Sequence, residues 1–327
     1  MAIRLSLAHT GLLIAILGSC SSPEQSVQRL FDVETGTIKL PPGPLELTRP
    51  LRIRPNAHDI EVVGSEGTLL RPSADFNGRA LILVQNASRV KLRNFAIDGN
   101  RKVLERAMDL PPDSSAFMMH FGNNGILIDE CKEVEISGLE IREVAGFAIL
   151  GRAVKKITVE KTKVEDSGGR NVAGHNNTTG GILFEEGTDD FTVRNCEFRR
   201  VLGNGVWTHS TFLSPRNYTG LIEDNQFDVV GRDAIQVGHA NRVRVQNNRG
   251  RFIGYPFQVV DMARMAIPVA VDTAGKVDEG VYTKNRFEEV NGKCFDLDGF
   301  HDGEVSENQC INRAPPAIIP TANSRWW

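Results

Sequence analysis

The stretch GILFEE, residues 181–186, and the stretch GVWTHS, residues 205–210, repeat one short pattern 24 residues apart. Each begins with glycine and then places apolar residues at alternate positions, the period of two that is typical of β-strands. Five further segments carry the same pattern: GILIDE (125–130), GFAILGR (146–152), AIQVGH (234–239), PFQVVD (256–261) and CFDLDG (294–299). The chain is therefore built from a repeating unit, and from Gly125 to Gly146 the unit is 21 residues long.

A second family of segments alternates with the first and completes the unit. Its members are VKLRNFAIDGN (90–100), VEISGLEIREV (134–144), ITVEKTKVEDSG (157–168), FTVRNCEFRRV (191–201), GLIEDNQFDVVG (220–231), RVRVQNNRGRFIG (242–254), GVYTKNRFEEVNG (280–292) and GEVSENQCINR (303–313). Each reads as two short strands around a polar or Asn-bearing turn, where Asn tolerates the left-handed conformation. Three short strands per unit indicate a stacked β-solenoid, in which each coil contacts only its neighbours.

This pattern resembles the right-handed parallel β-helix of the pectate-lyase-like superfamily. The segments GTIKLPPGPLELTRPLRI (36–53) and IEVVGSEGTLLRP (60–72) are similar to the first coils of such proteins, and the resemblance extends from about Thr35 to Arg313. It implies an all-β, single-stranded right-handed parallel β-helix with loop insertions, such as residues 170–180 and 263–276. A propeller is disfavoured because no four-strand blade is visible in the repeat.

The N-terminus has the features of an export signal. MAIR (1–4) is a short positive region and GLLIAIL (11–17) is apolar, but it is shorter than the roughly 20 residues that span a bilayer. LGSC (17–20) resembles the lipobox of bacterial lipoproteins, which implies lipidation of Cys20 after cleavage. We therefore expect a signal peptide over 1–19, a linker or cap over 20–34 and a β-helix over 35–327. The mature protein would be an exported outer-membrane or cell-surface lipoprotein, or otherwise periplasmic or secreted.

Composition limits the partners and the cysteine chemistry. The formal charge is −3 and the Lys and Arg residues are dispersed, so the footprint of nucleic-acid binding is missing. We expect a monomer that contacts a membrane only through its lipid anchor. The remaining cysteines are Cys131, Cys196, Cys294 and Cys310. Three of them adjoin strand-like runs, and we interpret them as buried, stacked thiols, although an exported chain permits disulfides.

Stacking turns the first family of segments into an exposed polar strip. If the apolar residues of GILFEE and its equivalents face inward, the residues between them face outward and align from coil to coil. The outward or strand-end residues of the later coils are Glu185, Trp207, His209, Gln236, His239, Gln258, Asp261, Asp296 and Asp298. Carboxylates and imidazoles can perform acid–base chemistry, and an exposed indole can stack on a pyranose. We therefore expect a polysaccharide or oligosaccharide as the partner of this strip.

Glycoside hydrolysis is the chemistry that the strip favours. It needs two carboxyl groups, about 5–5.5 Å apart for retention and 6.5–9.5 Å for inversion. Asp296 and Asp298 lie two residues apart on one strand, about 6.6 Å, whereas Asp261 and Asp298 would lie about one coil rise apart. The predicted catalytic set is Asp298, Asp296, Asp261, His239, His209 and Glu185, and the predicted substrate-binding set is Trp207, Gln236, Gln258, Arg152 and Arg232. This resembles the logic of polygalacturonase-type hydrolases, although their NTD, GHG and RIK motifs are absent.

Two other functions stay open on the sequence. A polysaccharide lyase or C5-epimerase would use Arg152, Arg170 or Arg232 as base, with calcium held by Glu185, Asp261 or Asp298. The lyase signatures WIDH and RxPxxR are absent, however. The DLDGFHDGE stretch (296–304) lacks EF-hand spacing, so calcium has no motif support and no cofactor is certain. A surface glycan-binding or structural β-helix is the non-enzymatic alternative.

Overall fold

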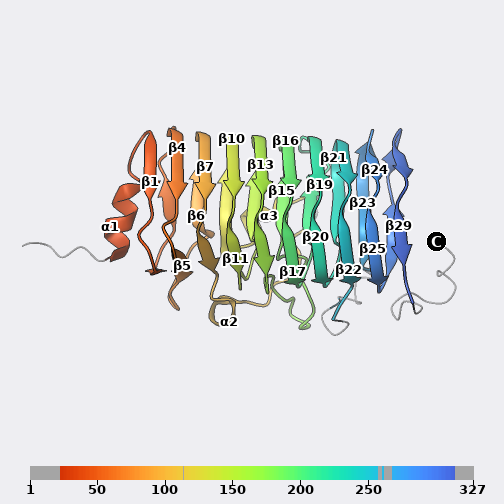
Figure 1. The fold of residues 1–327 in the computed structure, drawn as a ribbon, viewed down its shortest axis with the longest axis horizontal. Coiled ribbons are helices and arrows are strands. Elements are labelled where there is room, and N and C mark those ends of the chain that lie inside the picture. The colour runs from red at the N-terminus through yellow and green to blue at the C-terminus, as the bar shows by residue number, and fades with distance from the viewer. Residues whose placement is uncertain (1–22, 113, 257–259, 261–266, 314–327) are drawn as a thin grey trace, which may run out of the picture.

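The computed structural model describes residues 23–112, 114–256, 260 and 267–313. Within them the chain winds as a right-handed parallel β-helix, and Figure 1 shows its coils stacked along the long axis from α1 to β29. Every pairing between its named strands is parallel, as the repeat predicted. The expected all-β solenoid is therefore confirmed. The signal-peptide segment and Cys20 lie outside the described residues.

Each full coil contributes one strand to each of three faces. The first face contains β3 (Leu51–Ile53), β6 (Ala80–Gln85), β9 (Asn124–Asp129), β12 (Ile149–Arg152), β15 (Ile182–Glu185), β18 (Val206–His209), the start of β21 (Ile235–Gln246), the start of β23 (Val269–Asp278) and β26 (Lys293–Leu297). The second face contains β1 (Gly36–Lys39), β4 (His58–Val63), β7 (Ser88–Arg93), β10 (Lys132–Ser137), β13 (Lys155–Glu160), β16 (Asp189–Arg194), β19 (Asn217–Glu223), the ends of β21 and β23, β24 (Val281–Thr283), β27 (Phe300–His301) and β28 (Glu304–Ser306).

The third face is a separate ten-stranded sheet. It contains β2 (Pro44–Leu47), β5 (Leu69–Pro72), β8 (Ala96–Asp98), β11 (Glu140–Arg142), β14 (Lys163–Glu165), β17 (Glu197–Val201), β20 (Gln226–Val230), β22 (Arg249–Ile253), β25 (Arg286–Val290) and β29 (Gln309–Ile311). Three short helices lie outside the faces: α1 (Pro23–Leu30), α2 (Arg101–Leu104) and α3 (Phe117–His120). Helix α1 lies beside the first coil, at the N-terminal end of the β-helix, and its Val27 is buried. None of the helices in the described part of the chain has the length and apolarity to cross a membrane.

The core runs along the inside of the coils and consists of stacked, like side chains. Phe198 and Phe227 stack with ring centroids 5.0 Å apart, and Phe287 continues the row. Where a ring crosses the axis, the next coil makes room with glycine: a Cβ at Gly220 would come within 2.0 Å of the Phe191 ring. Stacked rows of this kind bury apolar surface at every coil, which is the main source of stability in a solenoid.

Asparagine has a second structural role between the second and third faces. The left-handed turn position is occupied by Asn195 and Asn247, as expected for Asn, but also by Lys161 and Lys284. The following residue points inward, and in the later coils it is again asparagine: Asn225, Asn248, Asn285 and Asn308 form a continuous hydrogen-bonded ladder. These asparagines therefore satisfy buried backbone groups as well as shaping the turn.

The cysteines divide into two kinds. Cys131 and Cys196 are buried free thiols, as the sequence predicted. Cys294 and Cys310 instead form a disulfide between β26 and β29, a bond that an exported chain permits, so the interpretation as buried thiols does not extend to this pair. Their Cα atoms lie 6.2 Å apart across the last coil, within the range that a disulfide spans.

Candidate functional site

Strand register on the first face aligns the outward side chains into two columns. The leucine column consists of Leu83, Leu127, Leu150, Leu183, Trp207, Gln236, Asp272 and Asp296. The Glu185 column consists of Gln85, Asp129, Arg152, Glu185 and His209. The predicted outward direction of Glu185, Trp207, His209, Gln236 and Asp296 agrees with this register. Polar groups dominate the leucine column only in the later coils.

The coil that follows β21 differs from the one expected. The sequence interpretation put PFQVVD (256–261) there and treated residues 263–276 as an insertion. In the structure β23 pairs with both β21 and β26, so Val269–Asp278 is the coil strand. Its residues PVAVDTAG alternate in the same way, with Val271 inward and Asp272 outward. Asp272, absent from the predicted set, therefore lies between Gln236 and Asp296, while Gln258 and Asp261 lie outside the described residues.

Asp272 is the centre of a buried polar network. Its side chain is 8% exposed and accepts a hydrogen bond from Gln236 Nε2 at 2.6 Å. Gln236 Oε1 in turn accepts one from Asn204 Nδ2 at 2.9 Å. Burial raises the pKa of Asp272 well above its usual range, and the neighbouring Asp233 and Asp296 carboxylates raise it further. Asp272 therefore keeps its proton to higher pH than an ordinary aspartic acid.

Asp233 lies beneath Asp272 at the turn that enters β21. It is 1% exposed, and its Oδ1 accepts the backbone N–H of Val269 at 2.9 Å. Burial raises its pKa, although Arg232, 3.3 Å from Oδ2, acts in the opposite direction. A negative charge on Asp233 raises the pKa of Asp272, so the two carboxyls do not ionise independently.

Asp296, one coil further along, is more exposed to solvent than Asp272. Its side chain is 38% exposed and pairs with Lys293 Nζ at 2.5 Å. Asp272 and Asp296 are register partners on β23 and β26. Directly paired strand positions lie about 4.8 Å apart, so the two carboxyl groups leave the same face as immediate neighbours. Asp272 is buried and has a raised pKa, whereas Asp296 is accessible and ion-paired.

A second polar cluster lies on the earlier coils around Glu185. Glu185 is fully buried, and its two carboxylate oxygens accept the backbone N–H groups of Phe117 and Met118, each at 2.8 Å. Burial raises its pKa to about 7 despite these bonds. Both oxygens are thus bound to α3, which places Glu185 under that helix rather than in contact with solvent.

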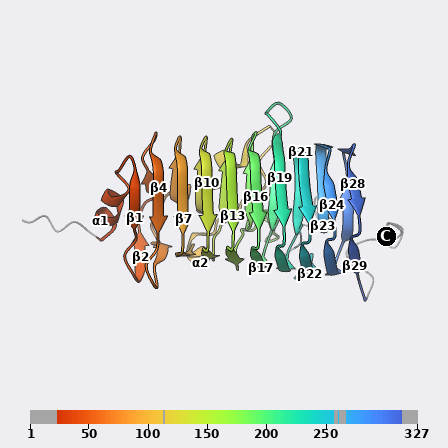
Figure 2. The ribbon, with the colours of Figure 1, turned by 45° about the horizontal axis from the view of Figure 1, so that its top comes forward.

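His209 and His239 continue this cluster toward the later coils. Their ring centroids lie 6.4 Å apart, and the Phe212 ring packs edge-on against His239 at 4.5 Å. Burial and the nearby Arg216 lower the pKa of His239, so its imidazole is neutral at pH 7. Phe212 belongs to the long connection between β18 and β19, which Figure 2 shows projecting beyond the neighbouring coils. Its side chain is 66% exposed.

The expectation that Trp207 offers an open stacking surface is wrong. Trp207 does face outward, but it is only 6% exposed because Phe117 of α3 packs on it at 4.7 Å, and Phe147 lies 6.3 Å away. Sequence alternation showed which side of the sheet the indole occupies. It could not show that residues nearly a hundred positions earlier return to cover it.

The predicted arginines are engaged in ion pairs. Arg152 contacts Asp129 at 2.6 Å and Glu130 at 2.7 Å, both on the preceding coil and its turn. Arg232 pairs with Asp233, as described above. Asp298 lies just beyond β26 and is exposed, and its carbonyl oxygen, rather than its carboxylate, accepts the Thr273 hydroxyl at 2.9 Å. The structure therefore groups Gln236, Arg232 and Asp296 with Asp272, and separates Glu185 and His209 from them along the strip.

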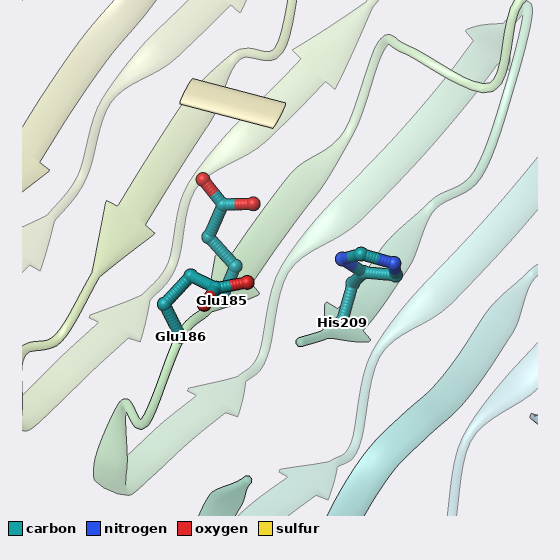
Figure 3. A group of neighbouring side chains, drawn as sticks. All are labelled: Glu185, Glu186 and His209. Atoms are coloured by element: carbon teal, nitrogen blue, oxygen red, sulfur yellow. The ribbon is translucent and has the colours of Figure 1, made fainter. Parts of the chain in front are cut away.

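Glu185, Glu186 and His209 come close enough to be considered as metal ligands. One potential ligand atom of each lies within 4.8 Å of the others, and Figure 3 shows His209 beside the two glutamates on the next coil. However, both Glu185 oxygens already accept N–H groups, and Glu186 accepts the Thr211 N–H at 2.9 Å. Calcium prefers six to eight oxygen ligands, and this group does not resemble such a cage. We assign no cation to it.

The sequence interpretation missed two functional candidates, Asp272 and Asp233. Asp272 and Asp233 each have a local signal, since VAVDT alternates like the other coil strands and Asp233 immediately precedes AIQV. The register of VAVDT was missed because the 14 residues between Ile253 and Pro268 include PFQVVD (256–261), which alternates in the same way and was taken for the coil strand. Counting back from CFDLDG by one 24-residue interval reaches Val271 from Phe295 and Asp272 from Asp296, and would have found the strand.

Comparison with known proteins supports the same architecture. The chain superposes on the surface adhesin PfbA of Streptococcus pneumoniae with a TM-score of 0.63 at 14% identity, covering 89% of this chain and 74% of the adhesin. It superposes on the GH136 lacto-N-biosidase of Eubacterium ramulus with a TM-score of 0.56 at 15% identity, covering 77% and 51%. An alginate lyase from a Paenibacillus species gives 0.50 at 12% identity, covering 78% and 91%.

These similarities show a shared fold and leave the chemistry open. The chain spans about half the length of the lacto-N-biosidase. No protein with a curated description matches its sequence. A family model described as right handed beta helix region matches residues 80–251, more than half of the chain. The chain therefore belongs to the right-handed β-helix family.

Proposed function

We propose that this protein acts on a polysaccharide or oligosaccharide and hydrolyses a glycosidic bond with Asp272 and Asp296. The observation that carries the proposal is the pairing of these two carboxyls on consecutive coils, in unlike environments. Asp272 is buried and its pKa is raised, whereas Asp296 is accessible and paired with Lys293. Two carboxyl groups that differ in this way are what glycoside hydrolysis requires.

The roles follow from the environments. Asp272, whose raised pKa suits a general acid, donates a proton to the glycosidic oxygen as the bond breaks. Asp296 attacks the anomeric carbon or stabilises the positive charge that develops there. The backbone positions of Asp272 and Asp296 lie about one strand spacing apart. Carboxyl groups at a similar separation would favour direct attack and a covalent intermediate, because a water molecule between them needs a larger gap. Gln236, bonded to Asp272 at 2.6 Å, orients the acid.

A lyase or epimerase is less well supported. β-Elimination needs a free base for the C5 proton and a cation to neutralise the uronate carboxylate. Arg152 contacts two carboxylates, Arg170 pairs with Glu105 and Arg232 pairs with Asp233, so all three predicted bases are already engaged. The raised pKa of Asp272 also suits an acid better than a carboxylate that must bind a cation.

The relatives in fold make a carbohydrate partner a reasonable proposal. A lacto-N-biosidase, an alginate lyase and a surface adhesin are among the solved structures with this fold. We further propose export of the chain and lipidation at Cys20, on the strength of the LGSC segment. Lipid anchorage would hold the strip near the cell surface, where polysaccharides are met.

The test is a panel of neutral and acidic polysaccharides analysed for two products. Hydrolysis releases reducing ends without unsaturated sugar, and Asp272→Asn and Asp296→Asn should each abolish the release. Asp189→Asn, on the second face, is the matched control and should retain it. Unsaturated products would replace the hydrolase proposal with a lyase. Binding without either product would support a surface glycan-binding protein instead.

A further inference from the structure

The chain makes a long excursion between β8 and β9. In other coils the third face connects to the first by a short turn, for example between Arg142 of β11 and Ile149 of β12. After Asp98 the chain instead runs through α2 and α3 before it enters β9 at Asn124. The last part of this excursion, residues 114–123, lies across the outside of the first face, and we call it the lid segment.

The lid segment covers the apolar half of the leucine column. Phe117, Met118 and Phe121 form one buried cluster with the outward side chains beneath them, which are Leu83, Leu127, Phe147, Leu150, Leu183 and Trp207. Phe117 packs on Trp207 at 4.7 Å and stacks with Phe121 at 5.7 Å. Without the lid segment, this row of apolar side chains would be open to solvent on the same strip as Asp272.

One carboxyl group fastens the lid segment at its centre. Glu185 lies beneath α3 and accepts the N–H groups of Phe117 and Met118, the first two residues of that helix. The side chain has no exposed surface. A carboxyl group in this position is unusual, because an apolar residue would complete the cluster without the cost of burying an acid.

We propose that residues 114–123 form a lid, latched by Glu185, that opens and closes over the leucine column and extends the sugar-binding strip to Trp207 when open. The part of the proposal that concerns sugar rests on the proposed function, and the lid itself does not. An exposed indole above a row of leucines would suit the apolar face of a pyranose ring.

The charges around Glu185 determine how the lid responds to pH. Burial raises its pKa to about 7, the two α3 N–H groups and Arg152 lower it, and Glu186 raises it. His209 lies beside it on the next coil, and His120 of α3 turns away to the Asp109 carbonyl. Once the lid opens, water reaches the carboxyl and its pKa returns toward 4.5, the ordinary value. The closed lid therefore holds the proton more tightly than the open lid.

The sign of the response follows from this difference. Closure takes up a proton between pH 4.5 and pH 7, so the closed lid is most favoured at low pH and opens as the pH rises through that range. With these two values, the ratio of open to closed lid grows about 70-fold between pH 5 and pH 8.

Two adjacent methionines provide the assay. Met118 is 6% exposed under the closed lid, whereas Met119 of the same helix is 62% exposed. Oxidation by hydrogen peroxide, followed by peptide mass spectrometry, gives a ratio of Met118 to Met119 oxidation that reports lid opening. In the wild-type protein this ratio should rise steeply from pH 5 to pH 8.

Glu185→Gln should remove the pH dependence, because the amide does not titrate. Glu186→Gln removes a neighbouring carboxylate that does not contact α3, and it should keep the rise. Phe117→Ala should raise the ratio at every pH without changing its slope, and circular dichroism would confirm that the coils of each variant remain intact. The proposal of a lid latched by Glu185 would be refuted by either of two results. One is a ratio of Met118 to Met119 oxidation that does not change with pH in the wild-type protein, and the other is a ratio that rises equally in Glu185→Gln. The methionine oxidation assay contains no sugar, so it tests the lid independently of the proposed function. A failure to cleave polysaccharides would refute the proposed function and leave the lid in place.

Discussion

Replacing Asn248 with alanine removes four hydrogen bonds from the inside of the β-helix. The Asn248 carboxamide accepts from the backbone N–H and the side chain of Asn225, at 3.1 and 3.0 Å, and donates to the Ile222 carbonyl and to Asn285, each at 2.9 Å. All three asparagines are at most 1% exposed. The groups left behind have no route to water.

The expected cost follows from that count. A hydrogen bond contributes about 1 kcal/mol net, and a buried donor left without an acceptor costs about 1–3 kcal/mol. Four bonds therefore predict a loss of about 4 kcal/mol in the free energy of unfolding. For a chain whose total stability is about 5–15 kcal/mol, such a loss would be conspicuous.

Urea unfolding followed by circular dichroism measures this loss. Asn195→Ala is the control, because Asn195 is exposed and occupies the left-handed turn position next to the ladder. Its replacement should lower the free energy of unfolding by only about 1 kcal/mol, because alanine adopts the left-handed conformation less readily. Similar losses in the two variants, or a loss below about 1.5 kcal/mol in Asn248→Ala, would refute the ladder as a source of stability.

Three further predictions concern the site, the last coil and the N-terminus. Asp233→Asn removes a negative charge that raises the pKa of Asp272, so the alkaline limb of the activity–pH profile should move to lower pH, and an unmoved limb would contradict the coupling. Reducing the Cys294–Cys310 bond, whose cysteines are 16 residues apart, should lower stability by about 3 kcal/mol in urea unfolding, and an unchanged midpoint would contradict this. Cys20→Ser should move the protein expressed in a bacterium from the detergent phase to the aqueous phase in Triton X-114 partitioning, and wild-type protein in the aqueous phase would contradict lipidation.

The repeat made most of the fold predictable. In a solenoid each coil contacts its immediate neighbours, so local alternation and spacing carry nearly all the structural information. The inward positions of Ile182 and Phe184 and the outward position of Glu185 followed directly from that alternation. Within the described residues, a register error arose after the interruption between Ile253 and Pro268, where the competing segment PFQVVD was taken for the coil strand and Asp272 was missed.

The site was less predictable because its environment comes from outside the repeat. The burial of Trp207 and Glu185 depends on Phe117 and Met118, which the chain contributes from an excursion several coils earlier. Alternation shows on which side of a strand a residue lies, whereas the cover over that side is set by tertiary packing. The greater burial that distinguishes Asp272 from Asp296, and the raised pKa of Asp272 that follows from it, are likewise not revealed by alternation along a strand.

The configuration of the first sugar released tests the adjacent-coil carboxylate pair most directly. Proton NMR, recorded immediately after the wild-type protein cleaves a glycan from the panel, distinguishes the two anomers before they equilibrate. Asp272 and Asp296, as register partners about one strand spacing apart, predict a product that retains the configuration of the substrate. An inverted product would contradict the pairing of these two carboxyls as acid and nucleophile.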